Sequence, residues 1–520
     1  MNGMVAVVMV VAGIVAVPVA RADNDNIRRG VAALNRGDTE RGIRWLEEGL
    51  QETPGSFSGN LNLGTAHLTA ARYSLAQEHL EKALAIKPGD RAVRSNLAVA
   101  YSARGLSSQA IEMAASLVRE DHGNAEFHTT LGAVYQAAGE YTEALKSFQQ
   151  ASERDPAQER YHLNLGKLFL MMRRFDDAQR SYEAALALNA KSDAGLVGLG
   201  EVARETGDYA RARKLFSQAL TLDPRNAQAQ GEMGLLFEMQ GQFDQALFRY
   251  LQALRQEPGN ERYLRAIASC HMKRNDYAQA IAYYRQLTVA NPRSVEGHGE
   301  LGNALFAQGD YYGAVESLKR ALEFNEKNTR YLSLLGQVYL ALENSELARG
   351  CFEDVLKVEA ENSDARLYLG IIALEQKNLA QAERLLRGVL AIDPAHMEAR
   401  YRVGMLDLET GRLDEALEHF RELASRTSRD ARVHYGMGLV YARQGDMRKA
   451  INALLEAIRF DGNHVDARWQ LAKIYDSVND YERAYNEYRA VLRLEPGHYL
   501  KDEISRRIEF MITKGVRVRD

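Results

Sequence analysis

The small residues of this chain recur with a period of 34 residues. When the chain is divided into 34-residue units from residue 23 onward, position 8 of every unit is glycine or alanine, from Gly30 to Ala472. Position 20 is Gly42 in the first unit and alanine in the thirteen units that follow, from Ala76 to Ala484. Self-similarity at such a period is the signature of a repeat architecture, so a division into several unrelated globular domains is excluded.

The prolines obey the same period. After residue 23, all eight occupy position 32 of a unit: Pro54, Pro88, Pro156, Pro224, Pro258, Pro292, Pro394 and Pro496. Proline cannot continue a helix, so each one marks the turn that separates a unit from the next. A second turn is marked near position 15 by glycine or asparagine, as at Gly105 and Asn275. Each unit is therefore predicted to form two helices.

The small columns indicate how these helices pack. Glycine or alanine at positions 8 and 20 allows the two helices of a unit to approach closely, and aromatic residues at position 24, such as Tyr182 and Phe216, fill the space between neighbours. Helices of about a dozen residues are marginal alone, so stacking of units must stabilise them. The predicted fold class is all-α, a solenoid of about fourteen units over residues 23–498.

These columns resemble the tetratricopeptide repeat, whose pattern places Gly at position 8, Tyr at 11, Ala at 20, an aromatic at 24, Ala at 27 and Pro at 32. One unit matches that pattern at all five later positions, with Tyr135, Ala144, Phe148, Ala151 and Pro156. The resemblance covers residues 23–498 and implies a right-handed superhelix of helix-turn-helix repeats that binds other proteins. The first unit departs from the pattern, since Gly42 and Gly49 replace alanine.

The two ends of the chain lie outside the repeats. Residues 4–19 are almost entirely apolar and are followed by Ala20-Arg21-Ala22, a small-x-small site, so residues 1–22 are predicted to be a cleaved signal peptide. The remaining 498 residues contain no second long apolar stretch, which predicts a soluble mature protein with no integral membrane segment. Residues 499–513 are predicted to be a capping helix, and residues 514–520 a short basic tail.

Composition and motifs exclude several function classes. The net charge is -4, so no excess of positive charge is available for nucleic acid. The sequence contains no HExxH, Walker loop, nucleotide-binding glycine fingerprint or serine elbow, and we expect no enzyme, cofactor or metal site. Cys270 and His271 are adjacent but occupy buried repeat positions, and Cys270 and Cys351 are too far apart in the stack for a disulfide.

The resemblance further implies that positions 2, 5, 6, 9, 12 and 13 of each unit line a concave groove. In the second to fifth units this surface is polar and nearly uncharged, and its position-6 residues form one candidate partner-binding group: Asn62, Asn96, Thr130 and Asn164. The asparagines resemble the ladder in the repeat domain of the eukaryotic O-linked N-acetylglucosamine transferase, where Thr130 would interrupt it. The alternative is that asparagine is simply common at position 6.

A second candidate group lies in the eleventh to fourteenth units. It consists of the aromatic residues Tyr368, Tyr401, Tyr435 and Trp469, with Arg402, Arg443 and Lys473 interleaved. Such a surface suits an interface hot spot or a sugar chain. The alternative is that tyrosine at position 5 is a generic residue of the family.

The sequence thus predicts a non-enzymatic scaffold that binds one or more proteins or extended peptides and no nucleic acid. The apolar leader predicts export to a bacterial periplasm, where the scaffold would assemble an envelope complex. Two alternatives stay open: an accessory that guides a polysaccharide during export, and an uncleaved leader that anchors the chain to the inner membrane.

Overall fold

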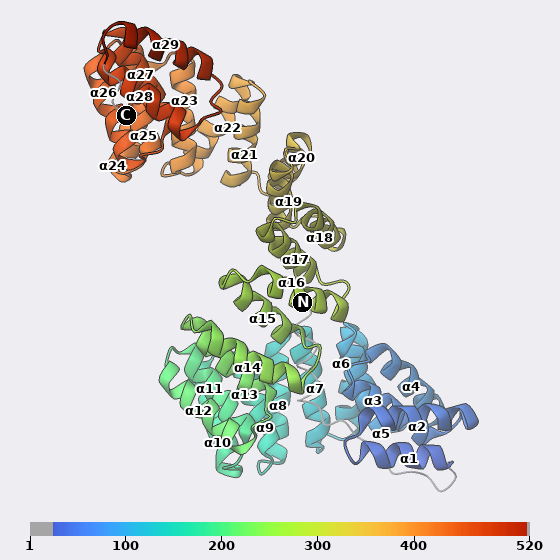
Figure 1. Cartoon of the computed structure of the whole chain (residues 1–520). Coiled ribbons are helices and arrows are strands. Elements are labelled where there is room, and N and C mark those ends of the chain that lie inside the picture. Colours follow the sequence, from blue (N-terminus) through green and yellow to red (C-terminus); the bar gives the residue numbers. More distant parts are fainter. Residues whose placement is uncertain (1–23, 517–520) are drawn as a thin grey trace. The chain divides into compact units, whose positions relative to one another are not determined.

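The computed structural model describes residues 24–516, and every helix or strand within that range is an α-helix. The chain divides into two compact units, residues 1–274 and 275–520. The first unit contains α1 (Asp25–Leu34), α2 (Thr39–Glu52), α3 (Phe57–Thr69), α4 (Tyr73–Ile86), α5 (Arg91–Ala103), α6 (Ser107–Glu120), α7 (Ala125–Ala138), α8 (Tyr141–Arg154), α9 (Glu159–Met171), α10 (Phe175–Leu188), α11 (Asp193–Glu205), α12 (Tyr209–Leu222), α13 (Ala227–Met239), α14 (Phe243–Gln256) and α15 (Glu261–Lys273) (Figure 1).

The second unit contains α16 (Tyr277–Ala290), α17 (Val295–Gln308), α18 (Tyr311–Phe324), α19 (Thr329–Ala341), α20 (Ser345–Val358), α21 (Ser363–Glu375), α22 (Leu379–Ile392), α23 (Met397–Glu409), α24 (Leu413–Arg426), α25 (Ala431–Arg443), α26 (Met447–Phe460), α27 (Val465–Ser477), α28 (Tyr481–Leu494) and α29 (Lys501–Thr513). Up to α28, odd-numbered helices are the first helices of the 34-residue repeats and even-numbered helices are the second helices. The predicted all-α solenoid of helix pairs is confirmed.

The turns follow from residues at two fixed positions. At position 34 most repeats have a polar residue whose side chain caps the next first helix, as where the Asp90 side chain accepts a hydrogen bond from the Val93 N–H. At position 15 every repeat has a left-handed residue, with a φ of 77° at Gly105 and 58° at Asn275. Four of these positions carry residues that the sequence did not mark as turns: Ala71, Arg173, Glu343 and Lys377. The left-handed backbone is unfavourable for these residues, but the helices on either side of the turn impose it.

The small residue at position 8 packs against the side chain at position 24 of the same repeat. A Cβ placed on Gly166 would lie within 3.0 Å of the Tyr182 ring, and one on Gly336 would lie within 3.0 Å of the Phe352 ring. Ala178 and Ala348 at position 20 are fully buried in the same repeats. The close approach of first and second helix is therefore the reason for both small columns.

The last helix closes the second unit. Ile504 and Met511 of α29 are fully buried in the core cluster that also contains Trp469 and Tyr488. Arg507 forms a bidentate ion pair with Asp476 of α27. α29 thus packs on the last repeat within the range 499–513 for which a capping helix was predicted. The predicted signal peptide at residues 1–22 and the tail residues 517–520 lie outside the described residues.

The tight packing around Gly299 predicts how one added methyl group changes the stability of the protein. A Cβ on Gly299 of α17 would overlap the buried ring of Tyr331 on α19. We expect Gly299→Ala to lower the free energy of unfolding by about 1–3 kcal/mol, because the ring cannot move without disturbing the core. Urea unfolding followed by circular dichroism measures this change.

The matched control is Gly350→Ala in α20, where a Cβ meets no atom within 4 Å. Alanine restricts the unfolded chain and favours a helix, so this variant should gain about 0.5–1 kcal/mol. Equal effects of the two substitutions would contradict the packing role of Gly299.

Candidate functional site

The predicted position-6 group lies in the layer of first helices of the first unit. Asn62, Asn96, Thr130 and Asn164 are all buried, with exposed fractions of 0 to 5%. Asn96 Nδ2 donates to Thr65 Oγ1 of α3 at 3.0 Å, and Thr130 Oγ1 lies 3.0 Å from Ser95 Oγ of α5. Two members of this group thus join neighbouring first helices. A partner-binding role for the group stays a prediction.

The predicted aromatic group lies on α21, α23, α25 and α27 of the second unit. Tyr368 stacks on Phe352 with ring centroids 4.8 Å apart, and Tyr435 packs on His464 at the same separation. Trp469 is 8% exposed between Tyr488 and His498. These rings are therefore largely covered by the chain itself, and burial raises the pKa of Tyr435 to about 12.

Cations accompany two of these rings. The Arg432 guanidinium lies 5.1 Å from the centroid of Tyr401, and the Lys473 ammonium lies 5.7 Å from that of Trp469. Arg432 also forms ion pairs with Glu398 and Asp430. Neighbouring rings and cations thus cover part of this surface, while Tyr368, Tyr401 and Tyr435 remain partly exposed. A partner-binding role for the aromatic group stays a prediction.

A hollow of about 400 Å³ lies between the first helices α17, α19 and α21 of the second unit. Its lining is polar and comes from consecutive repeats: Asn303, Thr329, Arg330, Ser333, Leu334, Gln337, Asn362 and Asp364. None of the residues of the two candidate groups predicted from the sequence lines this hollow. The available signal was that Asn303 and Gln337 are amides at position 9 of adjacent repeats.

The hollow offers hydrogen-bonding groups that the protein does not use. Within residues 24–516, the side chains of Asn303, Ser333 and Gln337 make no hydrogen bond, although each is partly buried. At its edge, Arg330 pairs with Glu300 of α17 at 2.6 Å. Unused amides in a concave place can pair with a ligand without first breaking an internal bond.

The first unit carries a row of charges along its first helices. Glu232 of α13 is 2% exposed and accepts from Arg204 of α11 at 3.1 Å and from Arg262 of α15. Burial, and then the charge of Glu232, raise the pKa of Glu201 on α11 to about 7. Glu201 accepts a hydrogen bond from Gln228 Nε2 at 2.7 Å.

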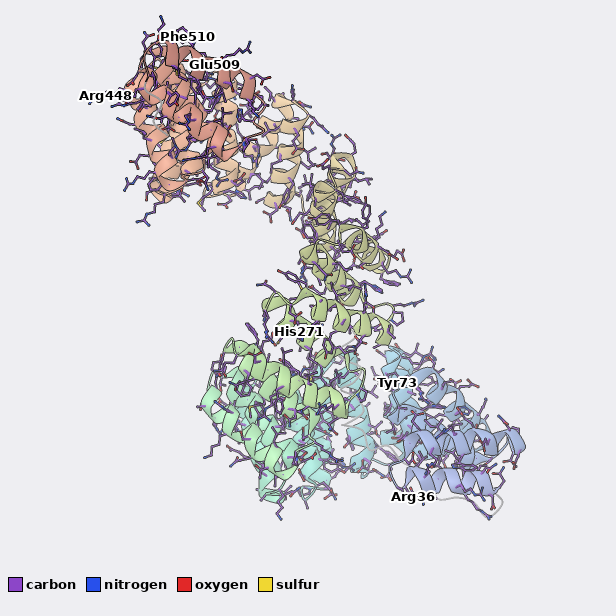
Figure 2. All side chains as sticks on the ribbon, in the orientation of Figure 1. Arg36, Tyr73, His271, Arg448, Glu509 and Phe510 are labelled. Carbon is purple, nitrogen blue, oxygen red and sulfur yellow. The ribbon has the colours of Figure 1, made fainter. Side chains whose placement is uncertain are left out.

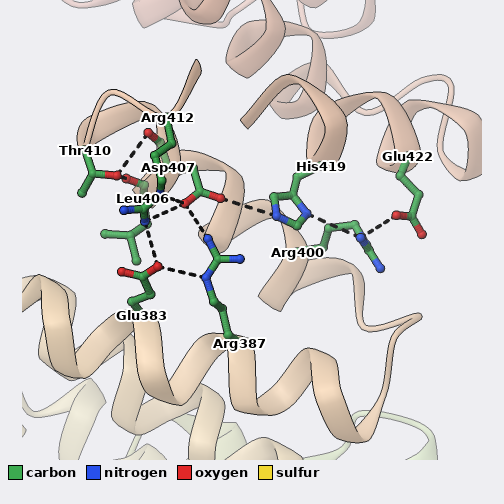
Figure 3. Close-up of polar contacts among 9 residues, drawn as sticks. All are labelled: Glu383, Arg387, Arg400, Leu406, Asp407, Thr410, Arg412, His419 and Glu422. Carbon is green, nitrogen blue, oxygen red and sulfur yellow. Dashed lines mark hydrogen bonds and ion pairs between the residues drawn. The ribbon is translucent and has the colours of Figure 1, made fainter. Parts of the chain in front are cut away.

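The most deeply buried acid of the second unit is Asp407, which is 0% exposed on α23 (Figure 3). Its Oδ1 accepts from Arg387 of α22 at 2.8 Å and from Arg412, which precedes α24, at 2.8 Å. Its Oδ2 lies 3.5 Å from His419 Nε2 of α24. The site occupies position 11, where the repeat pattern has an aromatic residue, so an ion network replaces ring packing between two repeats.

Histidines at position 4 have a structural role. The Nε2 atoms of His128, His162, His298 and His434 lie 3.0 to 3.2 Å from a carbonyl oxygen six residues earlier, in the turn between repeats. Each histidine thus fixes the turn that precedes its helix. The described residues contain no group of three or more metal-ligating side chains close enough for an ion.

The two cysteines are buried and unreactive in character. Cys270 lies on α15 directly before His271, which is labelled in Figure 2. Burial raises the pKa of the Cys270 thiol to about 12. Burial likewise raises the pKa of Cys351 on α20 to about 11. Burial of both thiols agrees with their predicted core positions and disfavours the thiolate form. None of the helices in residues 24–516 combines the length and apolarity needed to cross a bilayer.

Models of known families match most of the repeat region. Models described as the tetratricopeptide repeat match residues 67–134, 333–397, 373–439, 431–464 and 465–498. The model described as the C-terminal domain of cilia and flagella-associated protein 70 matches residues 103–331. No curated protein matches the chain.

Several solved structures are similar to this chain at low identity. The Cut9-Hcn1 hetero-tetramer of APC/C is 14% identical, with 92% of this chain and 95% of that chain covered and a TM-score of 0.43. A tetratricopeptide repeat protein from Parabacteroides merdae is 18% identical over 48% and 98%, with a TM-score of 0.39. PilF of Pseudomonas aeruginosa is 19% identical over 41% and 97%, with a TM-score of 0.37. Identities of this size concern the fold alone.

The Asp407 network predicts a strong effect of one charge. We expect Asp407→Asn to lower the free energy of unfolding by about 3 kcal/mol, because it leaves Arg387 and Arg412 without their buried partner. Urea unfolding measures the change. Asp354→Asn, which removes the exposed 2.7 Å pair with Lys357, is the control and should leave the unfolding midpoint unchanged. Similar losses in both variants would contradict the network's role.

The raised pKa of Glu201 predicts that the stability of the protein depends on pH. Its folded pKa of about 7 lies above the reference value of 4.5, so ionisation costs stability as the pH rises through this window. Glu201→Gln should therefore raise the free energy of unfolding by about 1–3 kcal/mol at pH 8, and the gain should vanish as the pH falls below about 4.5. Urea unfolding across this range measures it, and a gain that is independent of pH would refute the assignment.

Proposed function

Because the chain belongs to the tetratricopeptide-repeat family, whose members generally mediate protein–protein interactions, we propose that it is a non-enzymatic scaffold that holds an extended segment of a partner protein against its first helices. The observation that carries this proposal is the 400 Å³ hollow with its unused amides. The non-enzymatic part of the proposal rests on the family, which in general is non-enzymatic.

The chemistry of the hollow fits a polypeptide backbone. A backbone offers one donor and one acceptor per residue, and an amide side chain offers both in return. Asn303 and Gln337 come from adjacent first helices, which lie about 8–10 Å apart when packed, a distance spanned by about three residues of extended chain. Arg330 and Asp364 at the rim would then select side chains of the bound segment.

The proposal includes the location of the scaffold. The apolar residues 4–19 and the small-x-small site Ala20-Arg21-Ala22 support export to a periplasm, and an uncleaved leader that anchors the chain is the alternative. A partner in an envelope complex follows from that location. We do not extend the proposal to a polysaccharide, because stacking on sugars needs open ring faces and Trp469 is 8% exposed.

Site-specific photo-crosslinking in the native cell tests this function. A crosslinking residue at Ser333, inside the hollow, should capture a discrete partner protein from the envelope. The same residue at Tyr312 of the second helix α18, which is 80% exposed, is the control and should not capture it. Capture should fall about tenfold when Asn303 and Gln337 are both alanine.

Other outcomes would contradict specific parts of the proposal. Equal capture at Ser333 and Tyr312 would refute the hollow as the binding place. Exclusively cytoplasmic partners at Ser333 would refute export, and glycan adducts would favour the polysaccharide accessory.

A further inference from the structure

Two opposite charges stand at the same repeat position on neighbouring first helices of the first unit. Lys167 of α9 and Glu201 of α11 are both at position 9, and these two helices pack against each other. Both side chains are partly buried. They interact through space, since each charge shifts the pKa of the other, but no ion pair joins them.

Lys167 has no hydrogen bond or ion pair with any residue of the described range 24–516. Burial lowers the pKa of its ammonium group, because the charged form has lost water without gaining a partner. A lysine on an exposed surface would stay solvated, so this one carries a desolvation cost that an external acceptor can offset.

The neighbouring charges are already used. Glu232 binds Arg204 and Arg262, Glu205 lies 2.7 Å from Arg204, and Glu238 lies 2.8 Å from Lys273. Glu201, in contrast, accepts only from the neutral amide of Gln228. Neither Lys167 nor Glu201 therefore contacts an opposite charge, although the two lie at the same position of adjacent first helices.

We propose that Lys167 and Glu201 form a two-charge subsite for an extended partner segment that places a carboxylate against Lys167 and a cationic side chain against Glu201. This inference rests on the proposed scaffold function and names the class of segment that the first unit selects. Each contact of the bound segment supplies the opposite charge that the subsite lacks.

Geometry limits the spacing of the two ligand charges. Packed helices lie about 8–10 Å apart, and an extended chain rises about 3.3 Å per residue. Residues two or three apart therefore span about 7–10 Å. The expected recognition sequence is an acidic and a basic residue separated by one or two residues, in an order fixed by the direction of the bound chain.

Peptide selection tests the subsite. A display library of random dodecapeptides is selected against the full chain, against Lys167→Met, against Glu201→Gln, and against the double charge exchange Lys167→Glu with Glu201→Lys. The control is Lys214→Met, on the exposed side of the second helix α12. Thermal unfolding by circular dichroism selects only variants that keep the fold.

The wild-type and Lys214→Met proteins should enrich the same acid–base spacing. Lys167→Met should lose the acidic preference and Glu201→Gln the basic preference, each with binding of the wild-type peptides weakened about tenfold. The charge exchange should reverse the order of the two residues, because an extended peptide has a direction.

Two results would overturn the inference, and they distinguish failure of the subsite from failure of the scaffold function. Enriched peptides with the same charges in every variant would remove the subsite while leaving peptide binding by the scaffold intact. Absence of any enriched peptide with every protein would remove the proposed function together with the subsite.

Discussion

The structure depends on the contact between position 8 and position 24 of each repeat. At Gly166 and Gly336 the absence of a side chain lets the rings of Tyr182 and Phe352 lie directly on the first helix. This contact sets the distance between the two helices of a repeat. The buried alanine at position 20 of the second helix allows the same close approach. Since short helices are marginal alone, the rest of the stack forms only where this approach is possible.

The same contact determines what is left for binding. It commits one side of every first helix to its own second helix. The remaining positions of a first helix meet the second helix of the preceding repeat, a neighbouring first helix or a ligand. Asn96 and Glu232 contact a neighbouring first helix, through bonds to Thr65 and Arg262 respectively. Asn303 and Gln337 line the hollow and are available to a ligand.

The fold could be predicted from the sequence because its determinants are local and repeat at one period. Proline at position 32 and alanine at position 20 need no knowledge of distant residues. The left-handed residues Arg173 and Lys377 could not be predicted, because no intrinsic preference favours that backbone and only the flanking helices impose it. Likewise, nothing in the sequence around Asp407 shows that Arg387 meets it from another helix.

The candidate site was harder to predict, since position alone does not say whether a polar side chain is already bonded. The asparagines at position 6 are buried, and Tyr435 and Trp469 are covered by neighbouring rings. The hollow beside Ser333 appears only when all bonds of three adjacent helices are known. Sequence identifies which columns could face a ligand, and packing decides which of them remain free.

Two networks of charge show how this decision differs along the chain. Asp407 has no exposure and is surrounded by Arg387, Arg412 and His419, so its charge is offset within the protein and serves to join two repeats. Lys167 and Glu201 are partly buried, and no opposite charge contacts them within the described chain. A buried charge with ion-pair partners in neighbouring helices joins those helices, whereas a partly buried charge without such a partner lowers stability. The proposed selection of a partner segment by the first unit depends on these two unpaired charges, because a bound segment would supply the opposite charges that the protein does not.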